Sequence, residues 1–234
     1  LPEGSLYGTA ENREALASQA MLERAAASGK ILEGMAVLCD GEMALTVDLG
    51  CMRGIIPRGE AVYQPGGGEA RDIAVITRVG KPVCFRVISI ERNSAGESYA
   101  VLSRRAAQAE CVRCYLSSLI EGDIIPATVT HLEHFGAFVD VGCGIVSLLS
   151  IDCISVSRIS HPADRFYTGM NLRTVVRSIE RDAEGLVTRM YVSHKELLGT
   201  WAENAARFSA GQTVSGTVRS IEDYGIFVEL TPNL

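Results

Sequence analysis

The chain has 234 residues, of which 47% are hydrophobic, and a net charge of −6, which together indicate a globular protein of one to three small domains. No apolar run approaches the ~20 residues of a membrane helix and no signal-peptide pattern opens the sequence, so we expect a cytoplasmic protein with no membrane contact. The acidic balance argues against a strongly basic nucleic-acid binder, although segments 29–110 and 122–195 are close to neutral and leave room for a modest basic face.

The first half of the chain begins with a helix-like segment rich in Ala, Glu and Arg over 1–28, clearest in AENREALASQAMLERAAAS. Residues 29–102 are strand-like and punctuated by glycine. A second helix-like segment over 103–121 contains Cys111 and Cys114 in a CxxC arrangement. Seven cysteines in apolar contexts fit a reducing compartment, and no second pair stands at zinc-ribbon spacing, so we predict neither a metal nor a cofactor.

Residues 122–193 carry the clearest strand pattern. We predict strands near 124–132, 136–142, 145–151, 171–180 and 187–193. HPADRF (161–166) adds one helical turn, with Pro162 at its first position. Five short strands in about 70 residues, with a long irregular link before the fourth, suit a small closed barrel of the OB type.

The strand that begins at Gly136 carries an aromatic where a polar residue is expected. Because side chains alternate between faces, an inward Val139 leaves Asp140 and Phe138 on the solvent face. Strict alternation sends Phe135 to the other side, but Gly136 permits a bulge or bend that brings both rings to one surface. We interpret the rings as an exposed pair, the alternative being that each belongs to the core.

The chain ends with a third helix-like segment over 194–210 and a strand-like segment over 211–234. We expect the helix-like segments to space the barrels and Trp201 to pack against one of them. The last segment holds two strands' worth of chain, which is too little to close a barrel. We therefore expect this sequence to be part of a longer protein.

The sequence repeats itself at a spacing of roughly 90 residues, which is the size of a whole small domain. Residues 122–139 (GDIIPATVTHLEHFGAFV) align without gaps to 211–228 (GQTVSGTVRSIEDYGIFV), and a weaker copy begins at Gly29. The strong copies share glycine, valine and aromatic positions: Gly122/Gly211, Val129/Val218, Gly136/Gly225, Phe135/Tyr224 and Phe138/Phe227. The predicted fold is mainly β with linking helices, built as tandem five-stranded OB-fold barrels.

The phrase GDIIPATVTHLEHFGAFVDVG, followed downstream by RMYVSHKEL, resembles the RNA-binding repeat of bacterial ribosomal protein S-one. Related repeats occur in polynucleotide phosphorylase, RNase E and the alpha subunit of eukaryotic initiation factor two. The resemblance covers 29–234; it is strong in 122–193, good in 211–234 and degenerate in 29–102. The tandem arrangement and ISVSRISHPADRF are most similar to the short S-one-like proteins of Firmicutes such as clostridia.

The resemblance implies that single-stranded RNA crosses one face of the second barrel. The family's two aromatics, histidine, acid and arginine fall on Phe135, Phe138, Ser150, Glu180 and Arg189. Two of these depart from the pattern, since a serine replaces the histidine and the glutamate is longer than the usual aspartate. The third copy keeps Tyr224 and Phe227, and His134 on the first loop of the second barrel is a further candidate. Exposed aromatics suit RNA because every base has a π-face, and an arginine adds phosphate attraction.

The first copy has Met43 and Thr46 opposite the aromatics and Tyr99 opposite the arginine. We predict that its barrel forms but binds RNA weakly or not at all. The resemblance implies a protein-docking role, with the small ribosomal subunit as a candidate partner; a plain spacer is the alternative.

The sequence therefore predicts a non-enzymatic protein that binds single-stranded RNA (mRNA) as an S-one-like component of translation. A protein-interaction scaffold is one alternative, favoured by Ser150 and by the acidic balance. An RNA-binding accessory part of a longer enzyme is the other.

Overall fold

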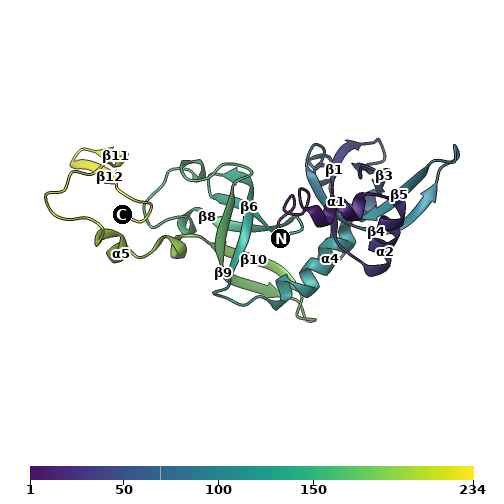
Figure 1. The fold of residues 1–234 in the computed structure, drawn as a ribbon. Helices are drawn as coiled ribbons and strands as arrows, with labels where there is room; N and C mark the ends of the chain where they lie inside the picture. Colours follow the sequence, from purple (N-terminus) through teal and green to yellow (C-terminus); the bar gives the residue numbers. More distant parts are fainter. Residues whose placement is uncertain (69) are drawn as a thin grey trace. The chain divides into compact units, whose positions relative to one another are not determined.

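The structure, a computed structural model, describes residues 1–68 and 70–234 and divides the chain into two compact units (Figure 1). The first unit comprises Leu1–Ser118 with Gly142–Ile145, and the second comprises Leu119–Val141 with Val146–Leu234. One closed five-stranded barrel belongs to the first half of the chain and another to the second half. The predicted mainly β fold with tandem barrels is thereby confirmed.

The first barrel has the strand order β1-β2-β3-β5-β4. Its strands are β1 (Leu32–Cys39), β2 (Leu45–Asp48), β3 (Arg53–Ile56), β4 (Pro82–Arg92) and β5 (Ser98–Ser103). A 3-10 turn η1 (Arg58–Glu60) and the short helix α3 (Asp72–Ile76) link β3 to β4. The parallel pairing of β3 with β5 closes the barrel around a core that includes Val47, Phe85 and Leu102.

Helices α1 (Ala10–Leu16) and α2 (Gln19–Ser28) precede this barrel, and α4 (Arg104–Cys114) with the 3-10 turn η2 (Leu116–Ser118) follows it. The helix-like segment expected over 1–28 therefore contains two helices, α1 and α2, and not one. Ser18 has an extended backbone, and its side chain accepts the Met21 N–H, so it caps the start of a new helix instead of continuing the first one.

The second barrel has the strand order β10-β8-β7-β6-β9. Its strands are β6 (Ile124–Glu133), β7 (Gly136–Gly142), β8 (Ile145–Ser150), β9 (Asn171–Arg181) and β10 (Val187–Ser193), each within one residue of the predicted bounds. The link between β8 and β9 holds two 3-10 turns, η3 (Ile151–Cys153) and η4 (Pro162–Asp164). The second is the turn predicted in HPADRF, with Pro162 at its start.

The helix-like segment expected over 194–210 is not one long helix either. A 3-10 turn η5 (Lys195–Leu198) and a short helix α5 (Trp201–Ala205) take its place. Gly199, at φ 77°, separates them, and Thr200 starts α5 with a capping box completed by Glu203. Trp201 is 62% exposed and does not bury its ring as expected.

The hairpin formed by β11 (Thr217–Glu222) and β12 (Gly225–Glu229) follows as a two-stranded sheet. Across the described ranges, no helix combines the length and the apolar character that crossing a membrane requires.

Candidate nucleic-acid interface

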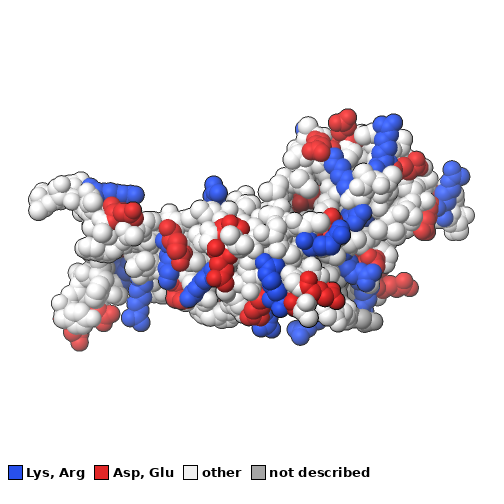
Figure 2. Space-filling view, turned by 90° about the horizontal axis from the view of Figure 1, so that it is seen from below, with Lys and Arg blue, Asp and Glu red and all other residues white. Residues whose placement is uncertain are grey.

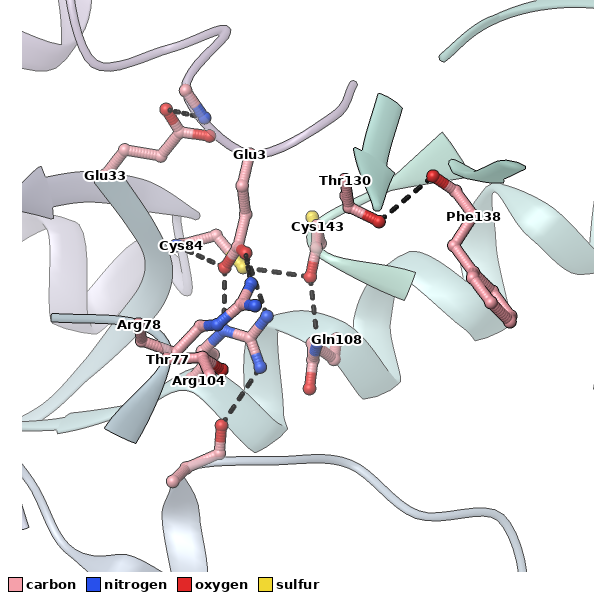
Figure 3. Close-up of polar contacts among 12 residues, drawn as sticks. Glu3, Glu33, Thr77, Arg78, Cys84, Arg104, Gln108, Thr130, Phe138 and Cys143 are labelled. Atoms are coloured by element: carbon pink, nitrogen blue, oxygen red, sulfur yellow. Dashed lines mark hydrogen bonds and ion pairs between the residues drawn. The ribbon is translucent and has the colours of Figure 1, made fainter. Parts of the chain in front are cut away.

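Phe135 and Phe138 lie together at the start of β7. Their ring centroids are 6.0 Å apart and the rings are perpendicular, at 89°. Phe135 is 56% exposed, whereas Phe138 is half-buried. Thr130 Oγ1 of β6 donates a hydrogen bond to the Phe138 carbonyl at 3.1 Å, and the Phe138 ring projects away from this contact (Figure 3). The two rings therefore form a small two-sided aromatic platform.

Gly136 makes this arrangement possible through a close approach of two strands. A Cβ atom at this position would lie 2.5 Å from the Leu149 carbonyl oxygen and 3.0 Å from Ser150 Cα. The Ile151 N–H also donates to the Phe135 carbonyl at 2.9 Å, which fixes the backbone beside the end of β8. The glycine is thus required by the spacing of β7 and β8.

His131 borders the platform, although sequence reasoning did not select it. It pairs with Phe138 across β6 and β7, beside a register shift between Val129 and His131. The two rings are nearly parallel, at 22°, with centroids 6.4 Å apart. His131 Nε2 also lies 2.8 Å from a carboxylate oxygen of Glu133. The contact between His131 and Phe138 could be predicted only from the register of β6 and β7, which the sequence does not show.

The alternation argument placed Asp140 on the solvent face, and that expectation is wrong. Val139 and Val141 are fully buried as predicted, but Asp140 is only 3% exposed. Alternation fixes which face of a strand a side chain occupies, but it does not determine what covers that face.

Arg189 and Glu180 are paired residues on β10 and β9, and both side chains are exposed. Ser150, half-buried, ends β8 and stands at the start of η3. Because β8 lies between β7 and β10, the aromatic platform and the Arg189–Glu180 pair stand on either side of it. Tyr191, two residues after Arg189, pairs with Leu148 of β8 and is half-buried on this sheet.

His134 is exposed and lies against a histidine from the β8–β9 link. The rings of His134 and His161 meet edge to face, with centroids 4.8 Å apart. His161 Nδ1 accepts the Ala163 N–H at 3.0 Å, so a neutral His161 ring carries its proton on Nε2. The link thus places a second imidazole beside the one that precedes Phe135.

Tyr224 and Phe227 reproduce the platform in the β11–β12 hairpin. Their centroids are 6.1 Å apart and the rings are again perpendicular, at 89°. Phe227 pairs with Ser220 beside a register shift between Val218 and Ser220, which matches the shift in β6. The sequence repeat is thus also a repeat of ring geometry.

The charges that surround these features are mixed in sign. On the face seen in Figure 2, Lys and Arg side chains alternate with Asp and Glu side chains and do not gather in a basic patch. Among residues 1–68 and 70–234, no group of three or more His, Cys, Asp or Glu is placed to hold a metal ion.

The S1 (S-one) RNA binding domain family matches residues 118–190, which include strands β6 to β9 and part of β10. The small ribosomal subunit protein bS1 homolog of Bacillus subtilis (strain 168) is 32% identical over 196 residues, covering 81% of this chain and 47% of the relative. Protein bS1 of Rhizobium meliloti (strain 1021) is 28% identical over 212 residues, covering 88% and 35%. The chain therefore spans about half the length of these relatives or less.

Among solved structures, GSP13 from Bacillus subtilis matches with a TM-score of 0.31 and 17% identity, covering 41% of this chain and 77% of that one. The a/eIF2alpha–aDim2p–rRNA complex from Pyrococcus horikoshii OT3 matches with a TM-score of 0.31 and 18% identity, covering 38% and 51%. The second barrel therefore carries an S1 RNA binding domain, and the chain is similar to bS1 proteins along most of its length.

Proposed function

We propose that this chain binds single-stranded RNA through its second barrel, as an S1-like component of translation. The observation that carries the proposal is the platform of Phe135 and Phe138, two rings held perpendicular at 6.0 Å at the start of β7. Stacking of a base on an aromatic ring contributes ~1–3 kcal/mol and tolerates any sequence. A surface of this kind suits a protein that handles varied RNA.

Polar groups around the platform support the same proposal. Arg189 offers guanidinium donors to a phosphate from the far side of β8, with Glu180 beside it as an acceptor for sugar or base N–H and O–H groups. His134 and Ser150 stand nearer the rings and can orient the backbone of a bound strand. Tyr224 and Phe227 offer a second stacking pair.

The name of the family and the names of the relatives support a role on the ribosome. We propose the first repeat as the part that contacts the small ribosomal subunit, because residues Met43 and Thr46 stand where the second repeat has its rings. In addition, Met43 has a left-handed backbone (φ 62°), so this loop differs in shape from its counterpart.

The proposal is tested by fluorescence-anisotropy titration of a labelled pyrimidine-rich RNA of about 12 nucleotides, within the usual site size of OB folds. We expect Phe135→Ala/Phe138→Ala to weaken binding by roughly tenfold or more, because two stacking surfaces are lost. Tyr7→Ala serves as the matched control, since Tyr7 is an exposed aromatic of the first unit whose backbone N–H, not its ring, contacts Glu33.

Circular dichroism and a thermal melt establish that each variant is folded. Equal binding by the parent and the double variant would show that the rings do not contact RNA. The function would then have to be sought in protein–protein contact.

A further inference from the structure

Three of the seven cysteines lie together in the first unit, which includes Gly142–Ile145. Cys84 belongs to β4, Cys111 to α4 and Cys143 to the turn between β7 and β8. All seven cysteines are thiols, and these three are buried, with Cys143 the most exposed of them at 8%. The proposed RNA contacts include none of the three, so their chemistry is a separate property of the chain.

Cys143 stands at a turn position that local sequence preference does not favour. Cys143 and Gly144 both have left-handed backbones, with φ 50° and 74°. A two-residue hairpin turn of this kind usually has Asn, Asp or Gly at its first position, because other side chains rarely adopt a positive φ. The turn itself therefore gives no reason for a cysteine at this position.

Contacts with α4 and β4 fix this turn within the first unit. The Cys84 thiol donates to the Cys143 carbonyl at 3.4 Å, and Gln108 Nε2 donates to the same oxygen at 2.9 Å (Figure 3). A Cβ atom added at Gly142 would lie 2.8 Å from Cys111 Sγ, so this sulfur lies directly against the backbone of the residue before Cys143. One sulfur atom from α4 and one from β4 therefore flank the turn.

The three sulfur atoms also contact one another. The side chains of Cys111 and Cys84 hydrogen-bond to the Cys143 side chain, and these bonds lower the pKa of the Cys143 thiol against the opposing effect of burial. Burial raises the pKa of Cys84 well above its usual range, so Cys84 keeps its proton and remains a donor. Cys143 is thus the member of the cluster that most readily becomes a thiolate, which is the reactive form of cysteine.

The CxxC pair of the sequence is divided between two environments. Cys111 is buried and lies against the turn, whereas Cys114 is exposed and its thiol donates to a Glu110 carboxylate oxygen at 3.2 Å. The hydrogen bond to Glu110 raises the pKa of Cys114, which disfavours its reactive form. The reactive thiol that contacts Cys111 is therefore that of Cys143.

We propose that Cys143 is a site of reversible oxidation by hydrogen peroxide, at which it forms a disulfide with Cys111. The Cys143 thiolate attacks one peroxide oxygen, the O–O bond breaks, and the products are a sulfenic acid and hydroxide. The Cys111 sulfur then attacks the sulfenic sulfur, the S–O bond breaks, and the Cys111 proton leaves with the hydroxyl group as water. A dithiol reductant restores both thiols and is itself oxidised to a disulfide.

Cys111 is the partner of Cys143 because Cys84 is fixed elsewhere. Cys84 pairs with Glu33 in the ladder of β1 and β4, and its N–H donates to a Glu3 carboxylate oxygen at 3.0 Å. Its thiol is directed at the Cys143 carbonyl, whereas the Cys111 side chain extends from a helix to the turn. A bond from Cys111 to Cys143 closes a loop from α4 to the turn and restricts the unfolded chain, so the oxidised protein should be more stable.

The test treats the full chain with hydrogen peroxide under native conditions, alkylates the remaining thiols and maps the products by mass spectrometry without reduction. Digestion with trypsin and Glu-C separates Cys111 from Cys114, and fragmentation distinguishes Cys143 from Cys153. We expect a link between Cys111 and Cys143 that dithiothreitol removes, together with a rise in the thermal midpoint of the oxidised protein.

Cys114→Ser is the matched control, because Cys114 lies on the same helix and is exposed, and this variant should form the link like the parent. Cys111→Ser should lose the link and leave a sulfenic acid at Cys143 that dimedone traps. A link from Cys111 to Cys114, a link from Cys84 to Cys143, or a Cys143 thiol that is alkylated as fully as in untreated protein would overturn the proposal. Because the mapping uses the parent chain itself, it decides the question even where a variant fails to fold.

Discussion

At the scale of single residues, Glu3 shows how one buried carboxylate organises the first unit (Figure 3). Its oxygens accept hydrogen bonds from Arg104 Nε at 2.7 Å and Nη2 at 2.8 Å, and from the Cys84 N–H at 3.0 Å. Burial acts to raise the pKa of Glu3, but the charge and hydrogen bonds of Arg104, the Cys84 N–H and the charge of Arg78 outweigh it, so the pKa is lowered. The ionised form is therefore the one that stabilises the fold.

A lowered folded-state pKa gives a definite pH dependence. The stabilisation from Glu3 is complete above the ordinary carboxyl pKa of 4.5 and is lost as the pH falls through the lower folded-state value. We expect Glu3→Gln to reduce the free energy of unfolding at pH 7 by about 3–5 kcal/mol, because Arg104 is left buried without its charge partner. The difference from the parent should shrink in acid.

Urea denaturation at pH 7 and at a series of pH values below 4.5 measures this difference. Glu11→Gln is the control, because the Glu11–Lys30 pair is exposed and its loss should leave the denaturation midpoint unchanged. A constant difference between the parent and Glu3→Gln across this pH range would contradict the assignment.

At the scale of elements, β7 and β8 come so close at Gly136 that an added side chain there should destabilise the fold. The same change at the aligned glycine of the third copy should cost less. We expect Gly136→Ala to reduce the free energy of unfolding by about 1–3 kcal/mol, because the new methyl group meets backbone atoms that cannot rotate away. It should also weaken RNA binding, since Phe135 is attached to the displaced residue. Thermal melts and the anisotropy titration measure both effects.

Gly225→Ala is the internal control, since a Cβ atom there meets nothing within 4 Å. The two glycines align in the repeat, so sequence alone assigns them the same role. Equal effects of the two substitutions would show that strand crowding does not explain Gly136.

The elements also show which parts of the fold could be predicted. The predicted bounds of strands β6 to β10 agree with the structure within one residue, because runs rich in valine, isoleucine and leucine are separated by turn segments that contain glycine, such as Gly122, Gly144 and Gly185. The helix-like segments over 1–28 and 194–210 are interrupted at Ser18 and Gly199, although their composition favours a helix throughout. Ser18 caps the start of a second helix, and Gly199 separates η5 from α5. Burial of Asp140 escaped prediction, because alternation fixes the face of a strand and not what covers that face. The Arg165–Glu229 ion pair joins segments 64 residues apart, a contact that no local pattern of the sequence shows.

At the scale of the whole molecule, the charge distribution limits how RNA can be bound. The chain carries 28 acidic residues against 22 basic ones, and the two signs are interspersed on the face seen in Figure 2. Binding that depends mainly on phosphate neutralisation would require a clustered basic surface. Under the proposed function, the stacking sites therefore supply most of the affinity, and Arg189 supplies only a small electrostatic part.

This balance predicts a shallow salt dependence. With Arg189 as the proposed phosphate contact, log K should fall with log[salt] with a slope of roughly −0.7, the value for one contact on a single strand. Arg189→Ala should reduce the magnitude of the slope by about 0.7. Arg92→Ala, which removes an exposed arginine of the first barrel, should leave the slope unchanged.

Anisotropy titrations of the labelled pyrimidine-rich RNA at salt concentrations from about 50 to 200 mM measure the slope. A slope steeper than about −3 would mean that a broader set of basic side chains neutralises the strand and that stacking is secondary. A slope near the expected value that changes with Arg189 but not with Arg92 would place the electrostatic contact beside the aromatic platform. The acidic composition and RNA binding are then compatible, because base stacking does not depend on the net charge of the protein.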